Sequence, residues 1–349
     1  SHVYATAGDH TIKITGSLPN ISFSGNAADR LKIKRVTQLG QVGWTRFGGA
    51  FYGCNNLTEF TVGSIDTSSI TNMSTMFTSC TALTSLDVSS FDTSSVTTMY
   101  AMFYNCPGLT SLDLSSFDTS SMGDMHEMFV NCTGLTSLDV SSFDVSNVWT
   151  MSYMFSGCTS LTSLDVSSFD TSSVTKMDSM FQNCTSLTSV DVSSFVTTSA
   201  LTTTGSMFYN CQDLTSLSFS STFDTSGVTN MSSMFRECTA LTSLDVSTFV
   251  TTSALLTTSS MFRSCTALTS VDVSSLDTSG VNNMSNMFVD CNALTSIVGV
   301  EDFIITGLDQ IGDLNAFLTI GRMTTAQYDA LLVKWEAQSE FAGMSPSFG

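Results

Sequence analysis

Ten cysteines recur along the chain at steps of 26 or 27 residues, at positions 54, 80, 106, 132, 158, 184, 211, 238, 265 and 291. The residues around them recur as well, so all ten occupy one position of one repeat. Each unit carries an L-x-x-L-x-L core, as in Leu83-x-x-Leu86-x-Val88. A period in the twenties with this core is typical of leucine-rich repeats, whose units each supply a short strand and a returning segment. The spacing predicts an α/β solenoid of about ten rungs with parallel strands.

The returning segment of each rung has the pattern of a helix. Apolar residues follow the candidate N-cap Ser95 at helical spacing: Val96, Met99, Met102, Phe103 and Cys106. Paired methionines such as Met99 and Met102 recur in most rungs, and their flexible side chains suit irregular gaps in a core. We therefore expect every rung to pack one apolar helix face against the strand layer.

Two rungs, those that end at Cys211 and Cys265, depart from the repeat in the same way. Each gains one residue near Ala200 or Ala254 and has threonine in place of the first methionine, at Thr204 and Thr258. Both also carry valine, at Val196 and Val250, where neighbouring rungs carry aspartate. These paired departures predict one loop variant shared by the two rungs.

The two ends of the chain break the repeat, and we expect them to cap the stack. A terminal rung would otherwise expose an unpaired edge and apolar surface. The sequence thus predicts a β-rich N-terminal cap at 1–46, the solenoid at 47–298 and a C-terminal cap at 299–349. In the last of these, "TTAQYDALLVKWEAQSEF" places Ala326, Ala330, Leu331 and Trp335 on one stripe of a closing helix.

The repeat also resembles a known family. The run M-x-x-M-F-x-x-C-x-x-L-T-S-L-D-V-S-S-F-D-T-S-S-V-T, over residues 47 to about 297, is similar to BspA-like leucine-rich repeat surface proteins of bacteria, which also occur in bacteriophages. The resemblance implies an exported or virion-associated protein, such as a phage tail component, that adheres to host surfaces or matrix proteins. The opening "SHVYATAGDHTIKITG" resembles the last strands of a polycystic-kidney-disease-type β-sandwich, with Ile12 and Ile14 in a strand. This second resemblance implies that the chain is a piece of a longer polypeptide.

The charge balance restricts the classes of partner. The chain has 11 Lys and Arg against 30 Asp and Glu, for a formal charge of −19, and six of the basic residues lie before residue 50. We expect no nucleic acid partner, because phosphate binding needs clustered cations. No run of about 18 apolar residues occurs, so we expect no direct membrane insertion. The N-terminus lacks a signal-peptide pattern, and we expect any export signal to lie outside this sequence.

The cysteine column has three interpretations. Free cysteine is among the most buried residue types, and the column coincides with the apolar side of the returning segment, which favours reduced, buried thiols. Neighbouring rungs are close enough for an occasional disulfide between adjacent cysteines. A zinc site is disfavoured because one thiol per rung, without CxxC pairs or paired histidines, does not make a tetrahedral set. We expect no metal and no cofactor.

Aspartates form a column on the open face of the predicted sheet. Strand alternation sends Leu86 and Val88 inward and Asp87 outward. The same position recurs at Asp113, Asp139, Asp165 and Asp191. One hypothesis is a cation-binding or ligand-facing stripe; the other is a charge that keeps the sheet from pairing with another copy. A second set, which includes Asp66 and Asp92, is expected to accept backbone N–H bonds in turns.

Aromatic residues give the clearest candidate for a binding site. The chain has only three histidines, His2, His10 and His126, and none is placed with a repeated acid or nucleophile, so we do not expect an enzyme. One side of rungs three to five instead carries aromatic residues where most rungs have small polar ones. Exposed aromatics grouped on one face indicate binding. The candidate binding residues there are Tyr100, Tyr104, His126, Trp149 and Tyr153.

These observations predict a non-enzymatic adhesion or receptor-binding module that displays an acidic solenoid surface. We expect its partner to be a host-surface protein or glycan, and its location to be extracellular, on a cell surface or on a virion surface, as part of a larger assembly. The competing hypothesis is a structural spacer or scaffold within a larger surface or virion protein. A spacer needs only a uniform exterior, whereas a binder needs a patch that departs from the repeat.

Overall fold

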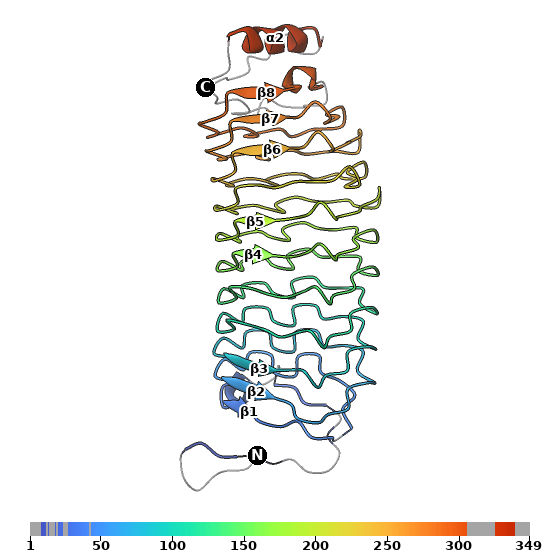
Figure 1. Ribbon diagram of the computed structural model, residues 1–349, viewed down its shortest axis with the longest axis vertical. Coiled ribbons are helices and arrows are strands. Elements are labelled where there is room, and N and C mark those ends of the chain that lie inside the picture. The colour runs from blue at the N-terminus through green and yellow to red at the C-terminus, as the bar shows by residue number, and fades with distance from the viewer. Residues whose placement is uncertain are drawn as a thin grey trace.

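The chain winds into a tall stack of rungs, each about one repeat long (Figure 1). The computed structural model describes residues 8–11, 13, 18, 20–23, 27–41, 43–305 and 325–338. Its elements, in order, are α1 (Ala27–Arg30), β1 (Arg35–Val36), β2 (Glu59–Thr61), β3 (Ser85–Asp87), β4 (Ser163–Leu164), β5 (Ser189–Val190), β6 (Ser243–Asp245), β7 (Ser270–Asp272), β8 (Ser296–Val298), the 3-10 helix η1 (Val300–Asp302) and α2 (Thr325–Glu336).

All strand pairs are parallel and join one rung to the next. The sheets are β1-β2-β3, β4-β5 and β6-β7-β8. The register advances by one repeat, so that Leu244 lies opposite Val271 and Val271 opposite Ile297. A second ladder of isolated bridges runs through the returning segments and joins Thr98, Asp124, Thr150 and Lys176 in succession. The predicted parallel-strand solenoid of stacked rungs is confirmed.

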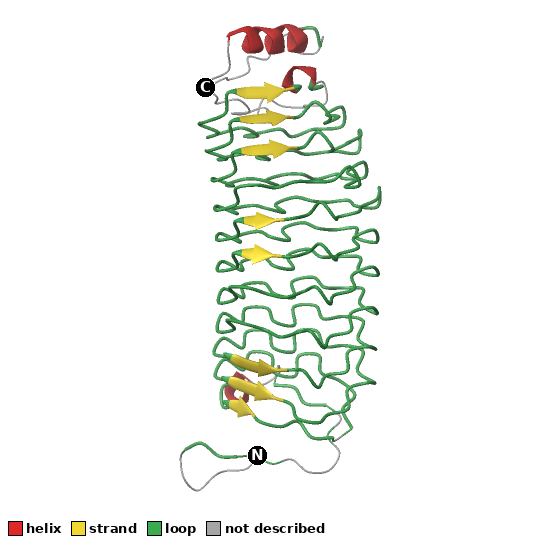
Figure 2. Cartoon of the chain, in the orientation of Figure 1, coloured by secondary structure: helices red, strands yellow, loops and turns green. Residues whose placement is uncertain are grey.

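The helix predicted in each rung is wrong. Between residues 43 and 299 the structure has no helix, and the returning segments are drawn as loops and turns (Figure 2). Their backbone N–H groups alternate between two kinds of acceptor. Met102 N donates to the Met99 carbonyl three residues back at 3.0 Å, whereas Phe103 N donates to Met128 O of the next rung at 2.9 Å.

Rung spacing explains why turns replace the helix. Paired strands lie about 4.8 Å apart, but packed helices need about 8–10 Å between their axes. Returning segments made of turns can stack at the strand spacing and bond directly to their neighbours, which keeps both sides of the stack equally tall. These turns require left-handed residues at two fixed columns, as at Ala101 (φ 51°) and Asn105 (φ 56°).

The two variant rungs share one conformation, as predicted. In both, the residue after the extra one closes a tight turn: Leu201 N donates to Thr198 O at 2.9 Å, and Leu255 N donates to Thr252 O at 3.0 Å. The rung that follows each variant has glycine facing the added residue. A Cβ placed on Gly227 would lie 1.9 Å from the carbonyl oxygen of Ser199.

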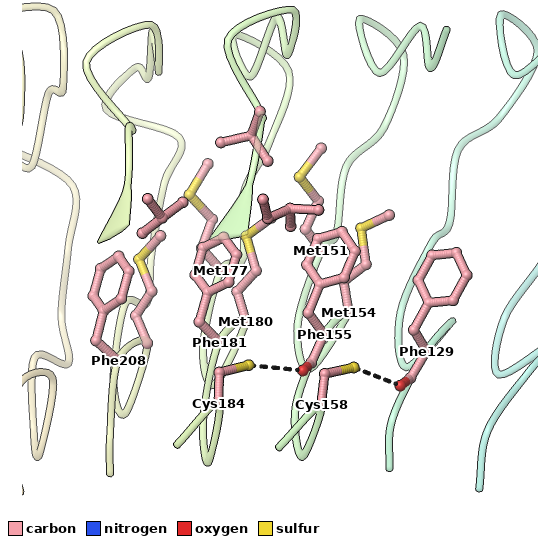
Figure 3. Close-up of a cluster of buried hydrophobic side chains, with 14 of the residues drawn as sticks. Phe129, Met151, Met154, Phe155, Cys158, Met177, Met180, Phe181, Cys184 and Phe208 are labelled. Atoms are coloured by element: carbon pink, nitrogen blue, oxygen red, sulfur yellow. Dashed lines mark hydrogen bonds between the residues drawn. The ribbon is translucent and has the colours of Figure 1, made fainter. Parts of the chain in front are cut away.

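A column of stacked phenylalanine rings runs through the core. The rings are parallel to within 14°, and successive centroids lie 5.3–6.0 Å apart. Methionines such as Met151 and Met154 fill the space beside the rings (Figure 3) and are fully buried. We call this set the phenylalanine column; its members are Phe51, Phe77, Phe103, Phe129, Phe155, Phe181, Phe208, Phe235, Phe262 and Phe288.

The ten cysteines are buried and free, as the preferred interpretation predicted. From Cys80 onward, each thiol bonds to a phenylalanine carbonyl of the preceding rung. Cys158 Sγ donates to Phe129 O at 3.3 Å and Cys184 Sγ donates to Phe155 O at 3.1 Å (Figure 3). Burial raises the pKa of the Cys184 thiol to about 12. These thiols therefore act as small core residues rather than as nucleophiles.

The last described rung is covered by α2. Leu331 and Trp335 of this helix are buried, as predicted, while Ala330 is exposed. The Lys334 ammonium pairs with Asp302. Gln338, just after the helix, accepts a bond from Ile305 N at 2.8 Å and donates one to Phe303 O at 2.9 Å. None of the described helices is long and apolar enough to cross a membrane.

The N-terminal predictions are only partly covered by the structure. Strand β1 precedes residue 47 and pairs with β2, so the sheet begins within the region that the sequence predicted as a cap. Ile12 and Ile14, which carried the resemblance to a β-sandwich, lie outside the described residues. The division of the chain at 46/47 and 298/299 stays a prediction.

Candidate functional site

A groove of about 650 Å³ lies on the returning face of the stack. We call it the aromatic groove. Four of the five predicted aromatic residues line it: Tyr100, His126, Trp149 and Tyr153. Tyr104 does not line the groove, although it lies in the same part of the stack. The structure thus brings together most of a patch that the sequence placed on one face.

Polar and charged residues that the sequence did not single out complete the lining. Asp124, Lys176 and Asp178 lie in the rungs that end at Cys132 and Cys184, and Asn230 lies two rungs further. These four residues occupy two columns of the stack, that of Thr98 and that of Tyr100. In the other rungs from Cys80 onward, the two columns hold serine, threonine, asparagine or glycine, except for Tyr100 itself and His126. The charged and aromatic residues at these columns therefore gather at one site.

Trp149 packs against a glycine of the preceding rung. A Cβ placed on Gly123 would be 3.5 Å from indole Cδ1 and 3.6 Å from Nε1. Threonine fills this column on both sides, at Thr97 and Thr175. The missing side chain at 123 leaves room for the ring, and the indole remains 48% exposed. Two adjacent departures from the repeat thus act together to present an open aromatic face.

Tyr100, His126 and Tyr153 form a ring cluster beside the indole. Tyr100 and His126 stack with centroids 5.5 Å apart and planes 8° apart, and Tyr153 meets His126 edge-on at 5.8 Å. Glu127 Oε1 lies 3.3 Å from His126 Nε2. Burial raises the pKa of the Tyr100 hydroxyl, and the negative charges of Glu127 and Asp124 raise it further. The tyrosine therefore stays a neutral hydrogen-bonding group.

Tyr153 occupies a backbone position that does not suit it. Its φ of 59° is left-handed, and this costs a residue with a side chain about 1–2 kcal/mol. The same column carries Gly49 in the first rung and Ser206 and Ser233 later. The stack enforces the conformation through a bond from Tyr153 N to Asp178 O of 2.9 Å. Thr75 and Glu127 have the same left-handed backbone in this column, so the stack sets the conformation and Tyr153 differs from them in carrying a ring.

Buried hydroxyl groups form the floor of the aromatic groove. Thr150 Oγ1 donates to Ser152 Oγ at 3.3 Å, and Ser152 Oγ donates to Asp178 Oδ1 at 2.6 Å. Thr150 and Ser152 are buried, while Asp178 is half-buried. The chain of bonds fixes one oxygen of the Asp178 carboxylate, so this acceptor is held in place before a ligand arrives.

The predicted aspartate column lies on the strand side, away from the aromatic groove. Asp87, Asp113, Asp139, Asp165 and Asp191 are exposed, and each accepts a bond from the backbone N–H of the serine two residues later, at 2.8–3.1 Å. They close the turn after the strand, a role that the sequence had assigned only to the second set. In the described part of the chain, no group of three or more His, Cys, Asp or Glu could hold a metal ion. Both hypotheses for this column stay predictions.

Comparison with known families matches most of the chain. The model described as "Mycoplasma protein of unknown function, DUF285" matches residues 45–138, 110–217 and 202–302. The chain belongs to this family. No protein with curated annotation matches the sequence.

Several solved structures are similar to the chain. A leucine rich cell surface protein from Faecalibacterium prausnitzii is 17% identical, with 85% of this chain and 86% of that one covered and a TM-score of 0.34. A leucine-rich repeat protein from Bacteroides ovatus is 17% identical, with 97% and 99% covered and a TM-score of 0.35. One from Eubacterium ventriosum is 16% identical, with 84% and 86% covered and a TM-score of 0.37. The resemblance to bacterial leucine-rich repeat surface proteins is confirmed, and that to a polycystic-kidney-disease-type sandwich stays a prediction.

The aspartate column should make the folded chain less stable at acid pH. Bonds from the side chain and then the backbone of the following serine lower the pKa of Asp113, Asp139, Asp165 and Asp191. Because the folded pKa lies below the unfolded value of about 3.9, the stabilisation is complete above that pH and is lost as the pH falls through the folded values. We expect the urea midpoint to drop between about pH 4 and pH 2.

A triple substitution provides the control. Asp113→Asn, Asp139→Asn and Asp165→Asn keep an oxygen acceptor for the serine but cannot titrate. The triple variant should lose less stability on acidification than the native chain. An equal drop in both proteins would show that the serine bonds to this column do not drive the acid dependence.

Proposed function

We propose that the chain is a non-enzymatic adhesion or receptor-binding module that acts at a cell or virion surface through the aromatic groove. One observation carries the proposal: residues that break an otherwise uniform repeat gather in one groove on consecutive rungs. A repeat that served only to fill space would have no reason to pair Gly123 with Trp149, or to carry rings at His126 and Tyr153 where most other rungs have small polar residues.

The fold and the chemistry of the groove support binding. Stacked-repeat proteins present long continuous surfaces to their partners. Binding energy in such contacts concentrates in a few tryptophan, tyrosine and arginine residues that are partly enclosed. Trp149 and Tyr153 have this character, and the volume of the groove lies in the range of ligand sites, about 300–1,000 Å³. No catalytic activity is proposed.

A structural spacer remains the second candidate. The observation that favours it is the uniformity of most rungs, whose exposed residues are largely serine and threonine at the same columns. A spacer would tolerate changes in the aromatic groove without loss of function, so one experiment separates the two proposals.

The test is attachment of the purified chain to a panel of immobilised extracellular-matrix proteins and glycans. We expect at least one probe to bind, and Trp149→Ala with Tyr153→Ala to weaken that binding at least about tenfold, as expected for hot-spot residues. The fold should be unchanged, since both side chains point to the surface. Thermal denaturation of the same samples checks this.

The repeat supplies a matched control. Leu256 occupies the column of Trp149 and is 46% exposed, and Ser260 occupies the column of Tyr153. Leu256→Ala with Ser260→Ala should therefore leave binding unchanged. If no probe binds, or if both double variants bind like the native chain, the aromatic groove is not a binding site and the spacer is favoured.

A further inference from the structure

We infer that the aromatic groove binds a neutral, linear oligosaccharide that lies along the axis of the stack. This rests on the proposed function, because it names the ligand class for the same site. Four features carry it: the shape of the groove, the use of its backbone, the chemistry of its side chains and its charge.

The shape favours a linear ligand. The lining begins at Tyr100 in the third rung and ends at Asn230 and Ser232 in the eighth, with two or more residues from every rung between. Rungs stacked at about 4.8 Å make this a channel of roughly 25 Å. A sugar ring in a linear chain is about as long as one rung is tall. Each rung can therefore face one sugar unit.

In one column of the groove, the backbone N–H groups already donate to the next rung. Glu127 N donates to Ser152 O at 3.0 Å, Tyr153 N to Asp178 O at 2.9 Å, and Ser179 N to Gly205 O at 2.9 Å. Strand addition needs an open row of N–H and C=O groups, and the next rung already occupies these N–H groups. This column therefore offers a ligand its side chains and not its N–H groups, as suits a partner rich in hydroxyl groups.

The side chains match the two faces of a sugar. The negative face of the Trp149 indole attracts the polarised C–H bonds of a pyranose ring, as it does the positive edges of other rings. Carboxylates accept hydrogen bonds from hydroxyl groups, and lysine and amide groups donate to them. Asp124, Asp178, Lys176 and Asn230 provide both kinds of partner within the groove.

The charges select against anionic ligands. Asp124 and Asp178 line the groove and Glu127 lies beside His126, so a uronate or sulfated chain would meet like charge. Lys176 lies in the same rung as Asp178 and places one positive charge among these carboxylates. Charges of both signs within one channel suit a neutral chain that offers hydroxyl groups throughout.

The experiment uses neutral linear hexasaccharides of glucose, xylose, mannose and N-acetylglucosamine as probes, with hexagalacturonate as the anionic comparison. Calorimetry measures binding to the full chain. Acrylamide quenching of fluorescence reports on Trp149, because Trp44 and Trp335 are 5% and 2% exposed. We expect one neutral series to bind, with affinity rising from disaccharide to hexasaccharide, and to shield the indole from quenching. Hexagalacturonate should not bind.

Three variants locate the site. Trp149→Ala and Asp178→Asn should each lower the affinity for the hexasaccharide at least tenfold, whereas Leu256→Ala should leave the affinity unchanged. One outcome would overturn the assignment of an oligosaccharide ligand: no neutral hexasaccharide binds at millimolar concentration, while a matrix protein still binds in a Trp149-dependent way. That outcome would still support the proposed function as a binding module. Sugar binding that is insensitive to Trp149→Ala would also overturn it, because the sugar would then lie elsewhere.

Discussion

Phe155→Ala is expected to lower the free energy of unfolding by about 3–5 kcal/mol. The ring is fully buried in the phenylalanine column, 5.6 Å from Phe129 and 5.7 Å from Phe181. Backbone bonds such as Phe155 N to Met180 O, at 2.9 Å, hold the rungs at a fixed height. The cavity left by the ring therefore cannot close by collapse of its neighbours, and the loss should lie toward the upper end of the range. Urea denaturation monitored by circular dichroism measures it.

The same substitution should also change the shape of the transition. Each rung contacts only its neighbours, so a cavity in the middle weakens the coupling between the two halves of the stack. We expect a lower apparent m-value, because the halves would then unfold separately. Trp149→Ala, on the surface of the same rung, is the control and should change stability by less than about 1 kcal/mol. Equal effects of the two substitutions would contradict a tightly packed column.

Gly227→Ala is the second substitution with a large expected effect. Its new Cβ would lie 1.9 Å from the carbonyl oxygen of Ser199 and 2.7 Å from the carbonyl carbon, so one backbone segment must move. Overpacking against backbone costs about 1–3 kcal/mol or more, and we expect at least about 2 kcal/mol here. Gly280 faces Ser253 at the same distance, so Gly280→Ala should cost a similar amount. Thermal and urea denaturation measure both.

The extra residue in the preceding rung explains the need for glycine. Ser173 occupies the same column as Gly227, but follows a rung of ordinary length, and it is exposed. Ser173→Ala should therefore change stability by no more than about 0.5 kcal/mol. Deletion of Ala200 should relieve the clash, so that Gly227→Ala costs less in that background. An undiminished cost would show that the added residue is not its cause.

The sequence predicted the repeat, its core and its rung number, but not the backbone of the returning segment. Met99, Met102, Phe103 and Cys106 are all buried, as a helix would have them, so apolar spacing alone could not distinguish a helix from stacked turns. The distinguishing signal was the residue before the cysteine, which is glycine or asparagine in six of the ten rungs. Glycine and asparagine are the residues that best tolerate a left-handed backbone. The six are Gly53, Asn105, Asn131, Gly157, Asn183 and Asn210.

The aromatic part of the candidate site was predictable, but the charged part was not. Trp149 and Tyr153 can be recognised from the sequence, because large aromatic residues are unusual in this part of a rung. Asp124, Lys176 and Asp178 are ordinary surface residues until the rungs are aligned. Once Thr98, Asp124, Thr150 and Lys176 are known to form one ladder, the charged members stand out against threonine. The register, which depends on stacking, was the missing information.

The direction of the ladder bonds has a mechanical consequence. Bonds such as Phe129 N to Met154 O join one rung to the next, so they point along the axis of the stack (Figure 1). A force that pulls the two ends apart loads the bonds of one rung at a time, so the rungs separate in sequence and do not share the load. Each rung that opens frees 26 or 27 residues, or roughly 85–95 Å of extended chain. Under tension, the rod becomes a tether that lengthens in steps and can absorb a pull before its attachment breaks.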